Sequence, residues 1–554
     1  MTKKLIAMTA IVSILLLSLA GCGETPNFLG GPANEEKQMI KSSEVFIPIE
    51  KVRTLNPIIS KDEDAYYVDR LIYEGLFDYD ENLTLKTSLA DSYTYSADGT
   101  SVTIQVKKGI QWQDGKELNA DDVKFTIDAL ISASYSNSTL YASSVSNIKS
   151  TKLDGKDPYS ITVYFNNTSN IAMNNFTFPI VPKHQFKSVE DAKRLTSNFI
   201  PIGTGPYRVT EYNELSHIVL QGYEGYHGGS VPSNTLNLQI IPDKRDVINL
   251  MEVNNVSLTF SKDLDRDTVY TNKNVNVINF PSNEVELVGF NFRNAIMKNG
   301  KVRKAIASAI NTKDIIEGAY YKNGIENNTI YYPNYLGVAS DKTSNLYDIT
   351  QAKKLLAEAG FVDRNADGLV EGPNNETITI NILVNSEDQS RSAAAQMIRD
   401  NLAQLPIQTN LVSKEWNTYL ADLASGNYDI YVGGYQLRDN YDLRFLLHTN
   451  YANPIGYSNL ALDALLDRME SGISQKDRLA TYTQINDILV NDLPYFCLLY
   501  KTYGMITSPA LKGDINPLFF DLYRGCGEWY SLFEAPEAPE ADNSETAVNI
   551  LDVQ

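Results

Sequence analysis

The sequence predicts a mixed α/β protein, because strand patterns, turn residues and capped helix patterns follow one another along the chain. Apolar and polar residues alternate over 102–106, as in a strand with one buried face, and the apolar residues of 110–112 continue this pattern. Asp114-Gly115 then supplies a tight turn. Asn119 can cap a helix whose first turn carries two acids at 121–122. We therefore expect a strand, a turn and a helix in immediate succession.

Similar patterns predict further elements along the chain, and we find no internal repeat. The first helix is expected to begin near Asp64 and to end near Gly75, where glycine can adopt the left-handed conformation that closes a helix. Asp348 and Gln351 form a capping pair before a helix that Gly360 closes. The other predicted helices span 301–311, 388–403, 461–470 and 478–490, and a short strand is predicted at 377–384.

The first 22 residues have the composition of an export signal. Lys3 and Lys4 precede an apolar run, 5–20, that is too short to span a membrane comfortably. Residues 19–22, Leu-Ala-Gly-Cys, resemble the bacterial lipobox, in which the signal is cut before a cysteine that carries lipid. Cys22 is therefore the predicted lipidation site, and we expect its acyl chains to hold the protein on the outer face of the cytoplasmic membrane, on the periplasmic or cell-surface side. An ordinary cleaved signal with an incidental cysteine is the alternative.

The remaining chain is expected to form two or three domains, because it is too long for one hydrophobic core. Residues 23–45 lack a sustained apolar period and predict a flexible linker, whereas 534–554 predict a disordered acidic tail. The folded body is therefore expected between about 46 and 533. No later segment is long and apolar enough to cross a bilayer, and the formal charge of −20 argues against nucleic acid as a ligand.

A family resemblance rests on segments that are distributed along most of the body. Residues 107–123, KKGIQWQDGKELNADDV, preceded by ADSY at 90–93, resemble the signature of the oligopeptide- and dipeptide-binding proteins of ABC importers, the family 5 extracellular solute-binding proteins. Further segments resemble that family in the family's order, so the resemblance covers about 50–510. They are TLNP at 54–57, YEGLF at 73–77, GTGPY at 203–207, VRKAI at 302–306, AKKLL at 352–356 and YSN at 457–459.

The resemblance implies a two-lobed, periplasmic-binding-protein-like fold, with a hinge between the lobes and an extra subdomain in the first lobe. The first lobe would comprise 46–275, with the subdomain at about 84–199, and the second lobe would comprise 276–504. Residues 505–533 would return to the first lobe. Hinge closure would bury a solute between the lobes, and the permease subunits of an ABC importer would recognise the closed form. A monomer without a cofactor is expected.

Enzymatic activity is not expected, because the sequence shows no pair of nucleophile and base. The four histidines are too scattered for a metal cluster, and three of them, His217, His227 and His448, are expected to be surface or packing residues. A Gly-x-Ser-x-Gly elbow is absent from the sequence. The glycines of 203–205 lack the lysine and the spacing of a phosphate-binding loop, so they predict a tight turn.

The resemblance also implies where a peptide would be anchored, because relatives place a carboxylate after an aromatic residue to pair with the peptide's α-ammonium. Counting from Tyr435, the ungapped position is Arg438, and Asp439 follows one residue later. Asp439 is preferred, because a loop absorbs an insertion more readily than a binding site absorbs a charge reversal. Arg438 would instead favour a carboxylate or another anion through bidentate hydrogen bonds. Both residues could also be solvated loop charges.

Four further residues are predicted to contact the ligand. Trp416 matches a tryptophan that lines the cleft in relatives, and Tyr435, Gln436 and Tyr500 fall in neighbouring segments. Each aromatic residue could equally belong to a hydrophobic core, and one tyrosine among 34 carries little information. Trp416 and Tyr435 therefore rank above Tyr500.

Short peptides are the preferred ligand, but other solutes stay open. Relatives also bind nickel, haem, opines or oligosaccharides, and a fold does not choose its solute. A receptor or sensor lipoprotein that passes a peptide signal to a partner protein would show the same sequence features.

One loop copies the first half of a calcium-binding loop. Asp363, Asn365 and Asp367 place oxygens at positions one, three and five, and Gly368 follows at position six. The twelfth position is Asn374, where calcium loops use a bidentate glutamate. A polar turn is therefore favoured over a calcium site.

Cys497 and Cys526 are the only other cysteines besides Cys22. An exported protein can join such a pair in a disulfide, but sequence alone does not bring two Cα atoms within reach, so their pairing stays open.

Overall fold

The computed structural model describes residues 39–534, except for 51, 137, 169–170, 195–198, 242–246, 253–255, 272, 340–346, 374 and 376. The predicted signal with Cys22, residues 23–38 of the predicted linker and residues 535–554 of the predicted tail lie outside the described residues. Among the helices that are described, none combines the length and the apolar composition that a membrane span requires.

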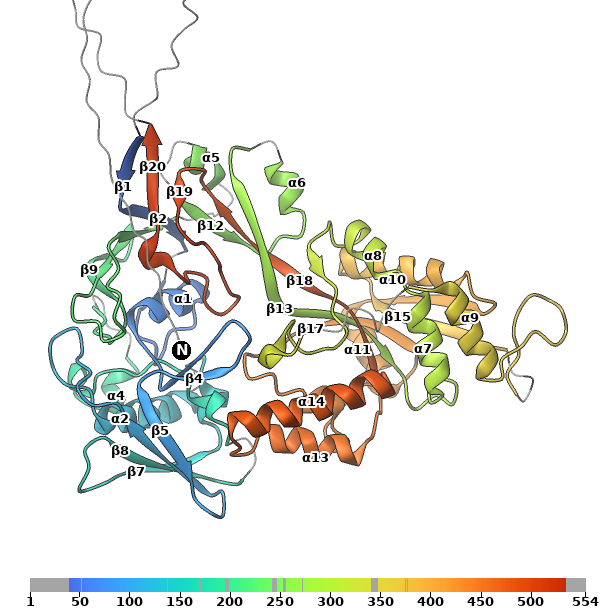
Figure 1. The fold of residues 1–554 in the computed structure, drawn as a ribbon, viewed down its shortest axis with the longest axis horizontal. Helices are drawn as coiled ribbons and strands as arrows, with labels where there is room; N and C mark the ends of the chain where they lie inside the picture. The colour runs from blue at the N-terminus through green and yellow to red at the C-terminus, as the bar shows by residue number, and fades with distance from the viewer. Residues whose placement is uncertain are drawn as a thin grey trace, which may run out of the picture. The chain divides into compact units, whose positions relative to one another are not determined.

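The described elements form a mixed α/β fold, as predicted (Figure 1). A four-stranded sheet near the start of the chain pairs β2 with β11 in parallel and is otherwise antiparallel. Helix α1 (Glu63–Ile72) packs against this sheet at β9. The strands, in sheet order, are β2 (Glu44–Ile49), β11 (Thr235–Ile240), β10 (His217–Gly222) and β9 (Tyr207–Asn213).

A second sheet, fully antiparallel, lies within the segment predicted as a subdomain. Helix α2 (Ala120–Ser134) packs on it and begins where the sequence predicts. The Asn119 side chain accepts a hydrogen bond from the Asp121 amide (2.8 Å), and Asp122 accepts one from the Asn119 amide (3.1 Å). This reciprocal cap satisfies amides that the first helical turn would otherwise leave free. The strands, in sheet order, are β5 (Ala90–Tyr95), β6 (Ser101–Val106), β8 (Ser160–Phe165) and β7 (Ile148–Leu153).

The largest sheet contains two long antiparallel strands, β13 (Asn276–Phe290) and β18 (Tyr495–Thr507). In Figure 1 these strands run from the region of α5 and α6 toward the region of α7 and α9. The predicted lobe boundaries at 276 and 504 fall at the start of β13 and near the end of β18. The sheet order is β12-β18-β13-β17-β15-β16, and β14 pairs with β18; the remaining strands are β12 (Leu258–Ser261), β17 (Ile430–Gln436), β15 (Thr379–Asn385), β16 (Gln408–Lys414) and β14 (Gly324–Ile325).

Helices cover the parallel part of this sheet. Strand β15 pairs in parallel with both of its neighbours, and its second half, 382–385, is buried on both faces. Asp348 caps α9 by accepting a hydrogen bond from the Gln351 amide (2.8 Å), and Gly360 follows with a left-handed φ of 89°, as predicted. The covering helices include α7 (Gly300–Ala309), α9 (Ile349–Glu358), α10 (Gln389–Leu402) and α11 (Trp416–Ser425).

Two further helices, α13 (Leu460–Met469) and α14 (Gln475–Asp492), pack against each other and reach the subdomain. The Ile171 amide donates a hydrogen bond to the Glu470 carbonyl (2.9 Å), and the Gln475 side chain donates one to the Leu85 carbonyl (3.3 Å). The segment predicted as the second lobe therefore contacts the subdomain directly. It is also joined to the first lobe through the long strands β13 and β18.

The described elements begin with β1 and β2, before the predicted start of the body at 46. The end of the predicted linker is therefore wrong, because β2 pairs with β11, a partner that comes much later in the sequence. The shorter elements are β1 (Met39–Ser42), β3 (Phe77–Tyr79), β4 (Leu85–Thr87), α3 (Ala142–Val145), η1 (Met173–Phe176), η2 (Lys183–Gln185), α4 (Val189–Ala192), α5 (Val247–Glu252), α6 (Arg266–Tyr270), α8 (Thr312–Gly318), η4 (Tyr335–Gly337), α12 (Arg444–Leu447), β19 (Leu511–Lys512), η5 (Cys526–Glu528) and β20 (Tyr530–Glu534).

One prediction about glycines needs correction, and both Gly75 and Gly203 allow a close approach of backbone segments. Helix α1 ends at Ile72 with an extended cap at Tyr73, so the predicted end at Gly75 is wrong. A Cβ atom on Gly75 would lie 2.7 Å from the Thr177 carbonyl oxygen, and one on Gly203 would lie 1.7 Å from that of Ile72. The turn predicted at 203–205 thus needs glycine for packing against the end of α1.

Cys497 and Cys526 are both buried and free, so they do not form a disulfide. The Sγ atom of Cys526 lies 3.5 Å from the Tyr207 hydroxyl. Burial raises the pKa of Cys526 to about 12, which keeps it a neutral thiol at physiological pH.

Candidate functional site

A cavity of about 1010 Å³ is bordered by segments that lie far apart along the folded body. Helix α1 and strand β3 contribute one wall, and the loop after β17, strand β18 and the segment 519–520 contribute others. These segments correspond to the predicted first lobe, the second lobe and the chain that returns from it. The cavity therefore lies where the resemblance implies a ligand.

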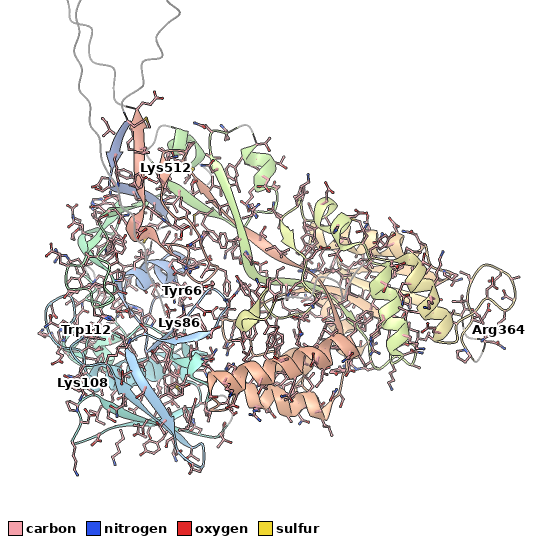
Figure 2. All side chains as sticks on the ribbon, in the orientation of Figure 1. Tyr66, Lys86, Lys108, Trp112, Arg364 and Lys512 are labelled. Carbon is pink, nitrogen blue, oxygen red and sulfur yellow. The ribbon has the colours of Figure 1, made fainter. Side chains whose placement is uncertain are left out.

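Helix α1 presents polar and aromatic side chains to this cavity. Tyr66 and Arg70, four residues apart, and Tyr73, just beyond the helix end, all line it. Because such spacing places side chains on one face of a helix, a single local element supplies this wall. Figure 2 shows Tyr66 in this region of the molecule.

Arg70 is the positive group of this wall, and it is already engaged. Its guanidinium forms an ion pair with Asp78 of β3, with an N–O distance of 2.7 Å. The same guanidinium lies 5.7 Å from the centre of the Phe520 ring. Arg70 is therefore held by contacts from the start and from the end of the folded body.

Asp439 lines the cavity from the loop after β17. Burial raises the pKa of its carboxyl group, while Arg70 and a hydrogen bond from the Tyr66 hydroxyl lower it and the nearby Asp78 raises it further. The balance is a raised pKa, because the effect of burial exceeds that of Arg70, which is itself paired with Asp78. A cation from a ligand would supply the charge that Asp439 needs to remain ionised while partly buried.

The loop that carries Asp439 is fixed at its start by β13. The Leu437 amide donates to the Asn283 carbonyl (2.8 Å), and the Asn283 side chain donates to the Leu437 carbonyl (2.6 Å). These two bonds place the loop immediately beside one of the long crossing strands. Its position is therefore set by tertiary contacts as well as by β17.

The same loop is fixed at its end by Tyr441 and Asp442. The buried ring of Tyr441 packs against Tyr331 and Tyr335, and its backbone adopts a left-handed φ of 51°, which is uncommon for a bulky residue. Asp442 forms two parallel hydrogen bonds with Arg444, of 2.8 and 2.7 Å. Strained backbone held by packing is typical of functional loops.

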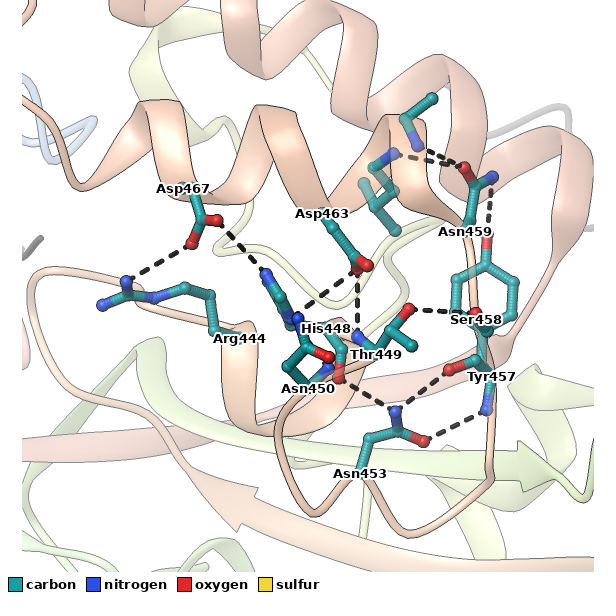
Figure 3. A network of polar contacts seen from close by, with 12 residues as sticks. Arg444, His448, Thr449, Asn450, Asn453, Tyr457, Ser458, Asn459, Asp463 and Asp467 are labelled. Carbon is teal, nitrogen blue, oxygen red and sulfur yellow. Dashed lines mark hydrogen bonds and ion pairs between the residues drawn. The ribbon is translucent and has the colours of Figure 1, made fainter.

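A polar network supports the chain beyond this loop (Figure 3). Arg444 also lies 3.6 Å from Asp467, and His448 approaches the same carboxylate at 3.3 Å. The Asn450 amide donates to Nδ1 of His448 (3.0 Å). His448 is buried among these partners, so of the two predicted roles, surface or packing residue, it has the second.

Three of the predicted ligand contacts border the cavity, namely Gln436, Arg438 and Asp439. Tyr435 does not border the cavity itself. Its ring lies 5.8 Å from the ring of Phe445, which does border the cavity. Its hydroxyl is 2.9 Å from the hydroxyl of Tyr431. The structure thus brings together both alternatives for the charged anchor, Arg438 and Asp439.

Trp416 and Tyr500 do not border the cavity. Trp416 begins α11, is 45% exposed and stacks on Tyr419 with a ring separation of 5.8 Å. Tyr500 is fully buried in β18, where its hydroxyl donates to the Ile330 carbonyl (2.7 Å). Tyr500 therefore contributes to the core in this structure.

Several residues of the cavity were not predicted as site residues, in particular Tyr66, Arg70, Asp78 and Phe520. Helix α1 was predicted, but its cavity-facing side became apparent only from the partners that lie opposite it. An arginine within an apolar helix pattern is the one local signal that could have indicated this wall.

The predicted calcium loop lies far from the cavity, near Arg364 in Figure 2. The carboxylates of Asp363, Asp367 and Glu371 place oxygens within 4.8 Å of one another. Asp363 accepts hydrogen bonds from the amides of Ala366 and Gly368, and Glu371 accepts one from the amide of Arg364. These bonds satisfy the carboxylates as a polar turn does, and the predicted twelfth position, 374, lies outside the described residues.

Long crossing strands and a large cavity bordered by charged and aromatic residues define a two-lobed solute-binding protein. The family model described as bacterial extracellular solute-binding proteins, family 5 Middle, matches residues 84–457. The chain belongs to this family.

Relatives of this chain have names that state different solutes. The oligopeptide-binding protein AppA of Bacillus subtilis is 24% identical over 533 residues, covering 92% of this chain and 96% of its own. Heme-binding protein A of Haemophilus influenzae is 23% identical over 547 residues, covering 93% and 98%. The solved structure of a nickel ABC transporter protein from Bacillus halodurans has a TM-score of 0.73 at 16% identity, covering 88% of this chain and 99% of its own, and it shows the shared fold alone.

Proposed function

We propose that this protein captures short peptides in the cavity and delivers them to the permease subunits of an ABC importer. The observation that carries the proposal is Asp439, a partly buried carboxylate at the cavity whose neighbouring arginine is paired with another acid. A peptide's α-ammonium is the cation that would pair with Asp439, through charge-assisted hydrogen bonds. Arg438, exposed beside it, would then serve the peptide's carbonyl or carboxylate oxygens.

The size and the lining of the cavity favour a peptide over a single ion. About 1010 Å³ is at the upper end of the range for sites that enclose drug-sized organic ligands. The lining mixes aromatic rings, carboxylates and amides, among them Tyr66, Asn175, Asp439 and Phe520. Such a surface accommodates varied side chains, particularly when water fills the unused space.

Closure of the two lobes would complete the site. The long pair β13 and β18 is the natural hinge, since it joins the segments on both sides of the cavity. Trp416 and Tyr435, which do not border the cavity in this structure, would form part of the wall after closure. A lipid on Cys22 would keep the protein beside its permease, and Cys22→Ser should release it from washed membranes.

The direct test is to identify what the folded body retains. Purified protein is incubated with a defined pool of di- to decapeptides, separated from unbound peptide, and analysed by mass spectrometry. Enrichment of peptides with free amino termini supports the proposal. Retention of a metal or haem complex in place of any peptide would contradict it and would assign a different solute.

A peptide sensor that is not coupled to import is the second candidate, because it would use the same cavity. Uptake of a labelled binding peptide by cells, compared with cells that lack this protein, separates the two. Uptake that depends on the protein identifies an importer component, whereas unchanged uptake together with tight binding identifies a sensor.

A further inference from the structure

Two buried polar groups at the end of α1 have an oxygen without a hydrogen-bond partner among the described residues. They are the Oδ1 atom of Asp69 and the hydroxyl of Tyr73, and each side chain belongs to a residue that is 2% exposed. Asp69 and Tyr73 are one helical turn apart, and the Tyr73 amide donates to the Asp69 carbonyl (2.7 Å). Both unpartnered oxygens therefore belong to side chains of the same turn of α1.

Leaving such groups unpartnered is unfavourable. A buried donor or acceptor without a partner loses its hydration and gains nothing in return, and a buried carboxylate loses more than a neutral group. Most buried polar groups in native proteins are satisfied, so each exception calls for a physical reason. A binding site that is completed by its ligand is one such reason.

Of the two groups, Tyr73 borders the cavity, whereas Asp69 lies one helical turn before Tyr73 and does not border the cavity. Tyr73 lines it, and so does Tyr141, which precedes α3 in the subdomain. Burial is the main cause that raises the pKa of both tyrosines, and the carboxylate of Asp69 raises it further in each. The negative charge of Asp69 thus acts on two tyrosines that border the cavity, although Asp69 does not border it.

The charges along this wall leave room for a positive group. Arg70 is paired with Asp78 at 2.7 Å, and His227 approaches Glu74 at 2.7 Å. Asp69 has no corresponding ion pair among the described residues, and burial raises the pKa of its carboxyl group well above its usual value. A cation brought by the ligand would reverse that shift and satisfy the orphan oxygen.

We propose that Asp69 and Tyr73 form a subsite for a basic side chain of the peptide, a lysine ammonium or an arginine guanidinium. This inference rests on the proposed function and specifies the class of peptide that is preferred. The N–H groups of the side chain would donate to the Tyr73 hydroxyl and, with a small shift of the tyrosine, to Oδ1 of Asp69. The rings of Tyr73 and Tyr141 would cover the aliphatic stem and the cation.

The test uses the full folded body and pairs of tripeptides that differ only in charge. Trialanine derivatives carry lysine or its uncharged isostere norleucine at each position in turn, and affinities are measured by calorimetry. The wild type should bind one lysine peptide at least about tenfold more tightly than its norleucine partner, as expected for a charge-assisted hydrogen bond. Asp69→Asn should abolish this preference and leave the affinity for trialanine unchanged.

Two control variants keep the result interpretable. Tyr73→Phe should reduce the lysine preference in part, and Asp91→Asn, at an exposed position on β5, should leave it intact. Thermal unfolding is measured alongside binding. Asp69→Asn should unfold at the same temperature as the wild type or at a higher one, because it removes a buried acid that the protein itself leaves unpaired.

Equal affinity of lysine and norleucine peptides in the wild type would overturn this inference alone, provided that trialanine binds. A lysine preference that survives in Asp69→Asn would also overturn it. A lower unfolding temperature of Asp69→Asn with an unchanged lysine preference would assign the two oxygens to a structural water. Failure of every peptide to bind would refute the proposed function as well.

Discussion

Replacing Asp439 with asparagine tests the anchor that the proposed function requires. The substitution keeps the size of the side chain and removes its charge, so the Tyr66 hydroxyl retains an acceptor. Truncating one partner of a buried, hydrogen-bonded charge pair costs about 2–5 kcal/mol. Asp439 is only partly buried, so we expect about 2 kcal/mol, or roughly a thirtyfold loss of affinity.

The assay compares free-amine tripeptides with their N-acetylated forms by titration calorimetry at pH 7. Asp439→Asn should weaken the free-amine peptides about thirtyfold and the acetylated ones far less, while the surface control Asp91→Asn changes neither. Because the pKa of Asp439 is raised, affinity for free-amine peptides should also fall as the pH drops through that raised value, where the carboxylate is protonated. Equal losses for both peptide forms would refute the reasoning. Tighter binding of acidic ligands that disappears in Arg438→Gln would transfer the anchor to Arg438.

Three further predictions concern stability, metal binding and the thiols. Glu286 is 1% exposed and paired with Arg391 at 2.8 Å, so Glu286→Gln should lower the free energy of unfolding in urea by about 3–5 kcal/mol. Burial opposes ionisation of Glu286, but the ion pair with Arg391 holds the pKa of Glu286 below its usual value. The stabilisation by this ion pair is therefore present at neutral pH and is lost as the pH falls through the lowered pKa. A Glu286→Gln variant with the same acid sensitivity as the wild type would contradict this. The loop 363–371 should act as a polar turn, so millimolar calcium should produce no binding heat and no shift in unfolding temperature, and a clear shift would establish a site. Cys497 and Cys526 should both react with a thiol reagent, but only after the protein is unfolded. Fewer than two reactive thiols per molecule, in unreduced and unfolded protein that lacks Cys22, would indicate a disulfide.

Local rules explain why much of the secondary structure could be predicted. The starts of α2 and α9 depend on side chains that cap amides two or three positions away, and those residues can be recognised without any knowledge of the fold. The left-handed Gly360 is likewise a local feature. The packing roles of Gly75 and Gly203 cannot be recognised locally, because the groups that exclude a Cβ atom there, the carbonyls of Thr177 and Ile72, are neighbours only in space.

The sequence by itself determined the family, the alternation of helices and strands, and a short stretch containing the charged residues Arg438 and Asp439 beside the cavity. Only the tertiary structure decided which groups surround Asp439, because Arg70 and Phe520 reach the cavity from opposite ends of the folded body. It also placed Tyr500 in the core, since exposure depends on the strands packed around a residue. Capping and periodicity act within a few residues of backbone, whereas burial and charge pairing depend on distances that the chain acquires only when its segments pack together.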